Sequence, residues 1–251
     1  MRVRSEHNWQ QNSERQRLLY GLILILFLAV GSAQAWGDET YSMEPIRPGA
    51  SAHFSQSLVD TLRPQGFRVS GDSDGVKTAI CEIFFARAIA TQDGALGSGV
   101  LYGRVKPGTL VGVIHFLIVE RYVRDYRSQT LRPGYYTMRY AAMPEGANGS
   151  DLDFVLLSPL SSDRNPAQVL PLNELVRRGR LASRTKRPAM MSLVEVDPDQ
   201  NFPSLITDDE GTSVLQLKLR VKSAKARKGD PLPELPLALV VVTFIPEDLG
   251  D

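Results

Sequence analysis

The side chains that most often carry out chemistry are scarce in this chain. It holds one cysteine, Cys81, and three histidines, His7, His53 and His115. A single cysteine excludes an intrachain disulfide and a cysteine-based zinc site, and three scattered histidines offer little to a multi-histidine centre. The sequence therefore predicts no catalytic residues, no metal site and no cofactor.

Two of these residues lie in strand-like segments. Cys81 stands among Ala79–Ile83, with no basic neighbour in the sequence to lower its thiol pKa, which favours buried packing over reactivity. His115 lies in the most apolar segment, on the face of Val113 and Leu117, which is typical of a packed histidine with one hydrogen bond. Both residues are predicted to be structural.

Carboxylates leave one catalytic hypothesis open. The densest acidic positions are Asp151 with Asp153, and Asp208–Glu210, and both sit at strand ends or turns, where aspartate is favoured for its local hydrogen bonds. A pair of carboxylates across a cleft can hydrolyse a glycosidic bond, and spacing in the sequence does not exclude such a pair. A hydrolase acting on envelope polysaccharide or peptide is therefore the competing hypothesis.

The segment Tyr122–Tyr140 is the strongest candidate for binding. It holds five of the eight tyrosines, together with several arginines. Exposed tyrosine and arginine are good anchors for sugars and protein partners, although tyrosine is also a common strand residue. The segment predicts a binding surface for a protein or glycan, formed by Tyr122, Tyr126, Arg127, Tyr136 and Arg139.

Charge argues against a nucleic-acid partner. The 29 Lys and Arg nearly balance 28 Asp and Glu, which gives a net charge of +1. Basic residues gather at 177–187 and 222–228, but no aromatic residues are interleaved with them, as single-strand binding would require. These clusters are interpreted as solvated faces.

Residues 1–35 have the three parts of a secretory signal peptide. A start carrying four arginines precedes the apolar run Leu18–Val30, and Ala33-Gln34-Ala35 follows. We expect cleavage after Ala35 and export to the periplasm or the cell exterior. An uncleaved anchor is the alternative, but the 13-residue run is short of the roughly 20 residues that span a bilayer. No other segment is apolar enough to span a membrane.

The rest of the chain reads as antiparallel β structure. Alternation over 213–222 predicts a half-exposed strand, the acidic turn before it predicts a hairpin with 202–207, and 110–119 and 239–244 read as covered strands. Further strands are expected at 78–88, 135–142, 153–158 and 191–196, with short helices at 51–62 and 172–178. Pro231–Pro236 is interpreted as a connection to a last strand at 237–245. These elements predict a β-sandwich or an open barrel at 76–251, with 36–75 as an N-terminal segment packed on it.

Three Pro-Gly turns separate the predicted strands: Arg47-Pro48-Gly49, Lys106-Pro107-Gly108 and Arg132-Pro133-Gly134. The last continues into Tyr135-Tyr136-Thr137, which resembles the PG-x-Y-T turn and strand of prealbumin-like and immunoglobulin-like sandwiches. The stretch from Gly99 to Leu193 is similar to an uncharacterised family of exported bacterial proteins, through Leu101–Gly103, Gly108–Phe116, the Tyr136–Tyr140 strand and Asp153–Pro159. This resemblance implies bacterial export and carries no substrate or functional residue. From the residues themselves we predict an exported antiparallel β-sandwich without catalytic activity, with a binding or structural role in the bacterial cell envelope.

Overall fold

The computed structural model describes the chain from Thr40 to Val242 with gaps. The described residues are 40–47, 53–73, 75–93, 101–117, 125, 129–142, 153–183, 185–209, 211–223, 225, 227, 229 and 231–242. Glu39–Asp251 forms one compact unit. The expected cleavage site at Ala35 lies outside the described residues. None of the described helices is both long and apolar enough to cross a membrane.

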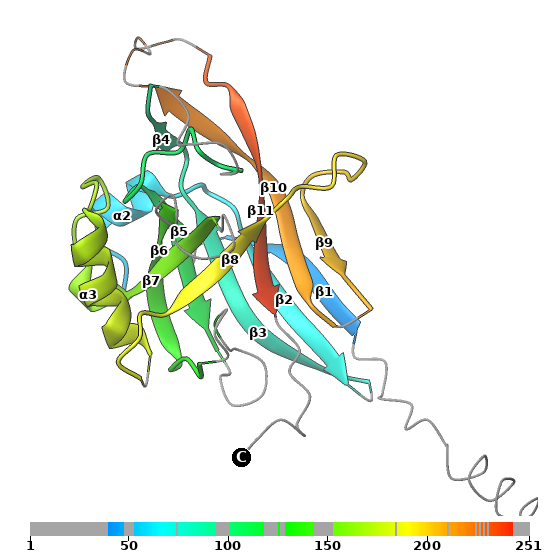
Figure 1. Cartoon of the computed structure of the whole chain (residues 1–251). Helices are drawn as coiled ribbons and strands as arrows, with labels where there is room; N and C mark the ends of the chain where they lie inside the picture. Colours follow the sequence, from blue (N-terminus) through cyan, green and yellow to red (C-terminus); the bar gives the residue numbers. More distant parts are fainter. Residues whose placement is uncertain are drawn as a thin grey trace, which may run out of the picture. The chain divides into compact units, whose positions relative to one another are not determined.

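Hydrogen bonds join the strands into one sheet of eleven, in the order β1-β2-β3-β5-β6-β7-β8-β11-β10-β4, with β9 also paired to β10 (Figure 1). Every pairing is antiparallel except that of β4 with β10. The strands are β1 (Thr40–Ile46), β2 (Gly66–Ser73), β3 (Val76–Phe85), β4 (Ile89–Thr91), β5 (Leu110–Phe116), β6 (Gly134–Ala142), β7 (Asp153–Pro159), β8 (Met190–Val194), β9 (Ser204–Thr207), β10 (Ser213–Ser223) and β11 (Glu234–Val242).

The sheet curls, so that β9 comes beside β1 (Figure 1). Its inner face encloses the main core, where residues such as Phe85 and Met138 meet Leu217 and Leu239 from the strands opposite. The prediction of a mainly antiparallel β fold with short helices is confirmed. The immunoglobulin-like or prealbumin-like sandwich is not confirmed, because one hydrogen-bonded order connects all the strands.

Two helices cover parts of the outer face. Helix α2 (Gln56–Thr61) is capped by Ser55 and packs Leu58 into a small cluster with Phe84 and Val113. Helix α3 (Leu172–Ala182) buries one side, including Leu175, in a second cluster over β6 and β7. The 3₁₀ turn η1 (Leu160–Ser162) begins the connection from β7 to α3.

The turn predictions hold at two of the three Pro-Gly sites. Gly108 and Gly134 adopt positive φ angles of 84° and 139°, which glycine accepts most easily. At the remaining site, Arg47-Pro48-Gly49, the proline and the glycine lie outside the described residues. The hairpin of β9 with β10 is confirmed, with Ser213 opposite Thr207.

The last strand corrects one expectation. Strand β11 begins at Glu234 and includes Pro236, which pairs opposite Lys218, so 231–236 is only partly a connection. Strand β8 pairs with β11 only at Ala238 and Leu239, and the start of β11 therefore has a single neighbour, where proline is tolerated. Strands β1, β2 and β4 were not predicted. The boundary predicted between residues 36–75 and 76–251 would separate β1 and β2 from the other strands. Both strands instead belong to the common sheet, and residue 75 lies in the turn between β2 and β3.

Candidate functional site

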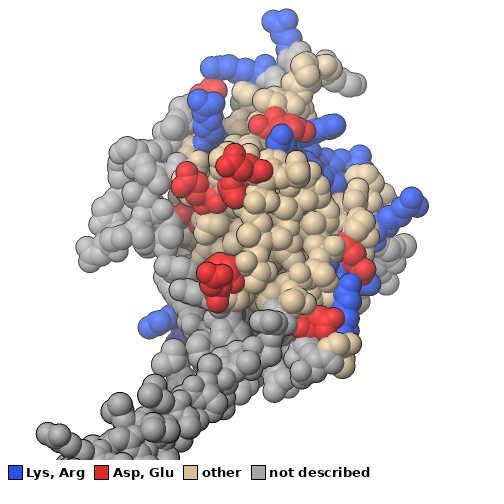
Figure 2. Space-filling model, turned by 90° about the vertical axis from the view of Figure 1, so that its right-hand side faces the viewer, with Lys and Arg blue, Asp and Glu red and all other residues tan. Residues whose placement is uncertain are grey.

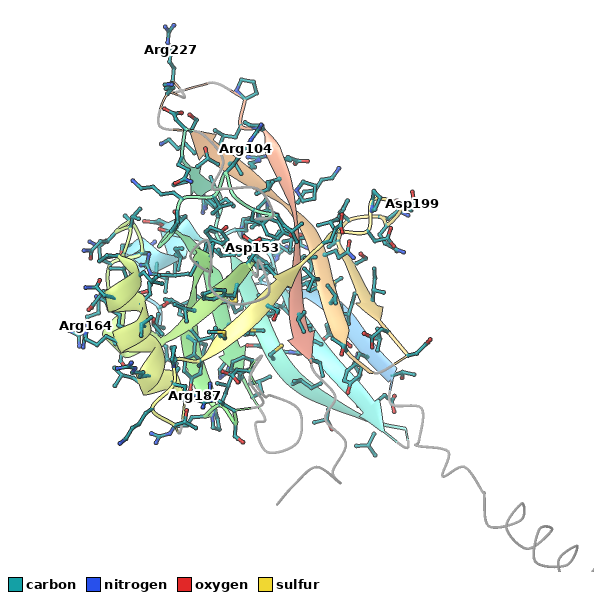
Figure 3. All side chains as sticks on the ribbon, in the orientation of Figure 1. Arg104, Asp153, Arg164, Arg187, Asp199 and Arg227 are labelled. Atoms are coloured by element: carbon teal, nitrogen blue, oxygen red, sulfur yellow. The ribbon has the colours of Figure 1, made fainter. Side chains whose placement is uncertain are left out.

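A pocket of about 430 Å³ opens on the outer face, between α2, the start of β6 and the β7–α3 connection. Figure 3 shows Arg164, one of its lining residues, on the side of the sheet that the helices cover. The lining combines aromatic, aliphatic and polar side chains from three segments: His53, Ser55, Leu58, Tyr135, Pro159, Leu160, Ser161, Asp163, Arg164 and Pro166.

Tyr135 forms the aromatic part of this lining. It is the second residue of β6, and strand alternation directs its side chain outward while Tyr136 enters the core. The ring stacks on His115 at 3.8 Å between centroids and 10° between planes. His53 lies 5.0 Å away at a tilt, and Phe54 meets the ring edge-on at 5.4 Å. These contacts fix the ring in one orientation.

Tyr135 ends a row of cross-strand neighbours on the outer face. In register, Glu44 on β1 faces Arg68 on β2, Arg68 faces Glu82 on β3, Glu82 faces His115 on β5, and His115 faces Tyr135. Arg68 bridges Glu82 at 2.7 Å and Glu44 at 3.2 Å, and the His115 Nδ1 lies 3.3 Å from Glu82. Partial burial raises the pKa of Glu82, but hydrogen bonds with Arg68 and His115 outweigh it and leave the pKa below its usual value. The row holds His115 beneath Tyr135.

A buried ion pair supports the opposite wall. Arg139 on β6 has no exposed surface, and its Nε and Nη2 donate to the two carboxylate oxygens of Asp163 at 2.5 and 2.9 Å. Its remaining hydrogens go to backbone oxygens of Gly108, Asn165 and Gln168, at 2.9, 3.0 and 2.6 Å. The side chain therefore ties the β7–α3 connection to the turn before β5.

Helix α3 extends this network to the surface. Arg178 donates to Asp163 at 3.1 Å and to Glu174 at 2.6 Å, and Arg177 also bonds Glu174. These hydrogen bonds lower the pKa of Glu174 to about 2. Thr137 donates to Asp163 at 2.7 Å, so both carboxylate oxygens of Asp163, which lines the pocket, are occupied.

Arg164 presents to the pocket a cationic group that forms no ion pair with any described residue. Its Nε donates to the Ser161 carbonyl at 3.3 Å, and its terminal nitrogens donate to no residue that the structure describes. Arg139 holds the two residues adjacent to Arg164 in the sequence, because it donates hydrogen bonds to the side chain of Asp163 and to the backbone carbonyl of Asn165. An exposed guanidinium is thus carried on an anchored piece of backbone.

The binding residues predicted from the sequence are placed differently. Tyr122, Tyr126 and Arg127 lie outside the described residues. Tyr136 is 4% exposed and donates its hydroxyl to the Arg132 carbonyl, and burial raises its pKa. Arg139 is fully buried, so the surface exposure expected of Tyr136 and Arg139 is wrong. Strand alternation turns the neighbouring Tyr135 to the opposite face of the sheet, and Tyr135 lines the pocket.

A second polar cluster lies inside the curled sheet, near the centre of Figure 3, where Asp153 is labelled. Asp153 accepts hydrogen bonds from the Tyr140 hydroxyl at 2.5 Å and the Leu101 amide at 2.7 Å. The Tyr102 hydroxyl donates to the Val194 carbonyl and accepts from the Ala238 amide. Burial raises the pKa of Tyr102 to about 12 and that of Tyr140 above its usual range. This cluster ties a loop to three strands and exposes little to solvent.

Two further sequence features have structural explanations. Cys81 is completely buried on β3, and burial raises its pKa to about 12, which confirms it as a packing residue. Gly71–Gly75 matches the Gly-x-Ser-x-Gly pattern of serine hydrolases, which sequence reasoning missed. Its described residues lie at the end of β2 and just before β3, so it connects two strands, whereas the hydrolase motif needs a strand-to-helix turn.

The side of the sheet on which β9 and β1 lie has a different character. Figure 2 shows this face as a broad uncharged area with separate acidic side chains, and with Lys and Arg gathered toward its margins.

In the described part of the chain, no group of three or more His, Cys, Asp or Glu side chains is placed to hold a metal ion. Comparisons with known protein families, curated proteins and solved structures found no match. The function is therefore inferred from the chemistry of the pocket.

Proposed function

We propose that this chain is an exported bacterial protein with a binding role in the cell envelope, and that the pocket beside Tyr135 is its binding site. The observation that carries this proposal is the pocket of about 430 Å³ with one fixed aromatic wall and several polar side chains. Ligand sites of this kind are concave and largely apolar, with a few polar groups that orient the ligand. A pocket near the lower end of their size range suits a small ring or one end of a polymer.

Of the two partner classes expected from the sequence, a glycan suits this pocket better than a protein surface. A protein partner needs a wide contact area, on the order of 800 Å² per side, whereas a pocket admits a single group. Tyr135 is half-buried and lines the pocket, so its aromatic side chain gives the wall apolar surface that can contact the C–H side of a sugar. Ser55, Ser161 and Arg164 surround it with groups that can bond sugar hydroxyls.

The hydrolase alternative receives less support from the same pocket. General acid–base chemistry needs a carboxyl group that can exchange a proton with the substrate. Asp163 is 3% exposed, and its oxygens accept from Thr137, Arg139 and Arg178. A carboxylate engaged in this way serves as a structural anchor, which favours a binding role.

The binding site can be tested with methyl β-glucoside as the probe, using saturation-transfer NMR on the protein isolated after export. We expect transfer to the sugar ring protons from the wild-type protein and its loss in Tyr135→Leu, which keeps apolar volume but removes the aromatic face. The matched control is Phe202→Leu, because Phe202 is a half-buried aromatic residue that does not line the pocket. No transfer from the wild type, or equal transfer from Tyr135→Leu, would contradict the proposal.

Export has its own test. The proposal follows from the charged start, the short apolar run and the Ala-x-Ala ending of residues 1–35. Mass spectrometry of the protein recovered from the envelope should give a chain that starts at Trp36. A chain that retains Met1 would support the uncleaved anchor instead.

A further inference from the structure

We infer that the pocket selects an acidic sugar, a ring that carries a carboxylate such as a uronic acid, and that Arg164 binds the carboxylate. This inference rests on the proposed function and specifies its ligand. It follows from the charge balance of the wall, from the hydrogen bonds that Arg164 leaves unmade, and from the way the backbone on both sides of Arg164 is held.

The wall around Arg164 carries an excess of positive charge. Among the described residues that line the pocket, Asp163 is the only carboxylate, and two guanidiniums, those of Arg139 and Arg178, bond it directly. Glu174, behind Arg178, is likewise shared with a second arginine, Arg177. With Arg164 added, four guanidiniums face two carboxylates. This surplus favours an anion in the pocket.

The other walls do not cancel this charge. On α2, the only acid is Asp60, which accepts a hydrogen bond from Gln56 and does not line the pocket. Behind Tyr135, Glu82 is already bonded to Arg68 and His115. Within the described residues, Asp60 and Glu82 are therefore engaged within the protein, which leaves the Arg164 guanidinium available to a ligand.

Arg164 is held ready for a planar anion. Its terminal nitrogens donate to no described residue, and Arg139 fixes the residues on either side of it. A guanidinium presents two parallel N–H groups that match the two oxygens of a carboxylate. The Ser161 hydroxyl also makes no hydrogen bond within the described residues, and it lines the same wall. One carboxylate and one neighbouring hydroxyl of the same ring would satisfy both groups.

The test uses three probes that share one ring and differ only at its sixth carbon: methyl glucuronide, methyl glucoside and methyl 6-amino-6-deoxyglucoside. They carry a negative charge, no charge and a positive charge. By NMR titration we expect the glucuronide to bind about 10-fold more tightly than the glucoside, and the amino sugar to bind most weakly. Added salt should weaken glucuronide binding and leave glucoside binding unchanged.

Two variants locate the effect. Arg164→Gln should remove the preference for the glucuronide, because only the charged sugar loses a guanidinium–carboxylate pair, whereas the glucoside loses at most one hydrogen bond to a hydroxyl. Arg187→Gln is the matched control, because Arg187 is also exposed but does not line the pocket. Both substitutions are on the surface, and circular dichroism checks that the fold is retained.

The outcomes separate the two levels of the proposal. If none of the three sugars binds, the proposed function fails. If the glucoside binds as tightly as the glucuronide, or if Arg164→Gln leaves the preference intact, the sugar site stands and the acidic ligand is overturned. Tighter binding of glucose 6-phosphate than of the glucuronide would also overturn the carboxylate assignment, in favour of a phosphate group.

Discussion

Removing the buried guanidinium with Arg139→Met should destabilise the protein strongly. The substitution keeps an apolar chain of similar length but deletes five hydrogen bonds, two to Asp163 and three to backbone carbonyls. It leaves Asp163, which is 3% exposed, with Thr137 and Arg178 as partners. Losing one partner of a buried ion pair costs about 3–5 kcal/mol, because the remaining charge stays away from water.

Thermal unfolding followed by circular dichroism measures this cost. For a chain of this size, 1 kcal/mol shifts the melting temperature by about 2–4 °C, so we expect a decrease of roughly 6–20 °C. Arg187→Met, which removes an exposed arginine, should leave the melting temperature unchanged. If Arg139→Met lowered the free energy of unfolding by less than about 1 kcal/mol, the reasoning would be refuted, because the hydrogen bonds of Arg139 would then contribute little to folding.

A double variant tests the cause of the loss. Arg139→Met with Asp163→Leu removes the orphaned carboxylate as well, and replacing both partners by apolar groups is often far less costly than removing one. We expect the double variant to be more stable than Arg139→Met alone, although three carbonyls remain without their donor. If the double variant loses as much unfolding free energy as the two single variants together, the burial of an unpaired Asp163 carboxylate is not the cause of the destabilisation.

Three further predictions concern other buried groups. Gly108→Ala should lower the free energy of unfolding in urea by more than about 2 kcal/mol, because Gly108 has a positive φ and a Cβ there would lie 1.9 Å from the Leu170 carbonyl oxygen. Cys81 should react with a thiol reagent at pH 8 only as the protein unfolds, since burial raises its pKa to about 12. The pKa values of Tyr102 and Tyr140 are raised in the folded state, so unfolding by urea should become easier as the pH rises from about 10 to 12, where only the unfolded tyrosines ionise.

The β class could be predicted because it depends on local patterns. Alternation at 213–222 and the positive-φ glycines of the Pro-Gly turns are properties of neighbouring residues. Strand β2 was missed because it contains Gly66 and Gly71, which normally weaken a strand. At Gly66, a Cβ would lie 2.4 Å from the ring of Phe84, so packing requires the residue that conceals the strand.

The site was harder to predict because it depends on which face of the sheet is covered. Polar residues alternate along β6, and such a pattern normally marks a face exposed to solvent. The β7–α3 connection instead folds over this face and brings Asp163 to Arg139, 24 residues away in the sequence. A single sequence contains no signal for that pairing, because neither residue differs in type from a surface residue.

The same pairing couples stability to binding. Arg139 touches no ligand in the proposed site, yet it bonds the residues on both sides of Arg164, so its loss should weaken glucuronide binding by releasing that segment. Arg164 makes one bond to the Ser161 carbonyl, and its loss should weaken binding while the melting temperature stays the same. The two variants therefore distinguish a residue that positions the site from one that contacts the ligand. If Arg139→Met retained full glucuronide affinity at a temperature where it is folded, the pocket would not depend on the buried pair, and Arg164 would need another explanation for its placement.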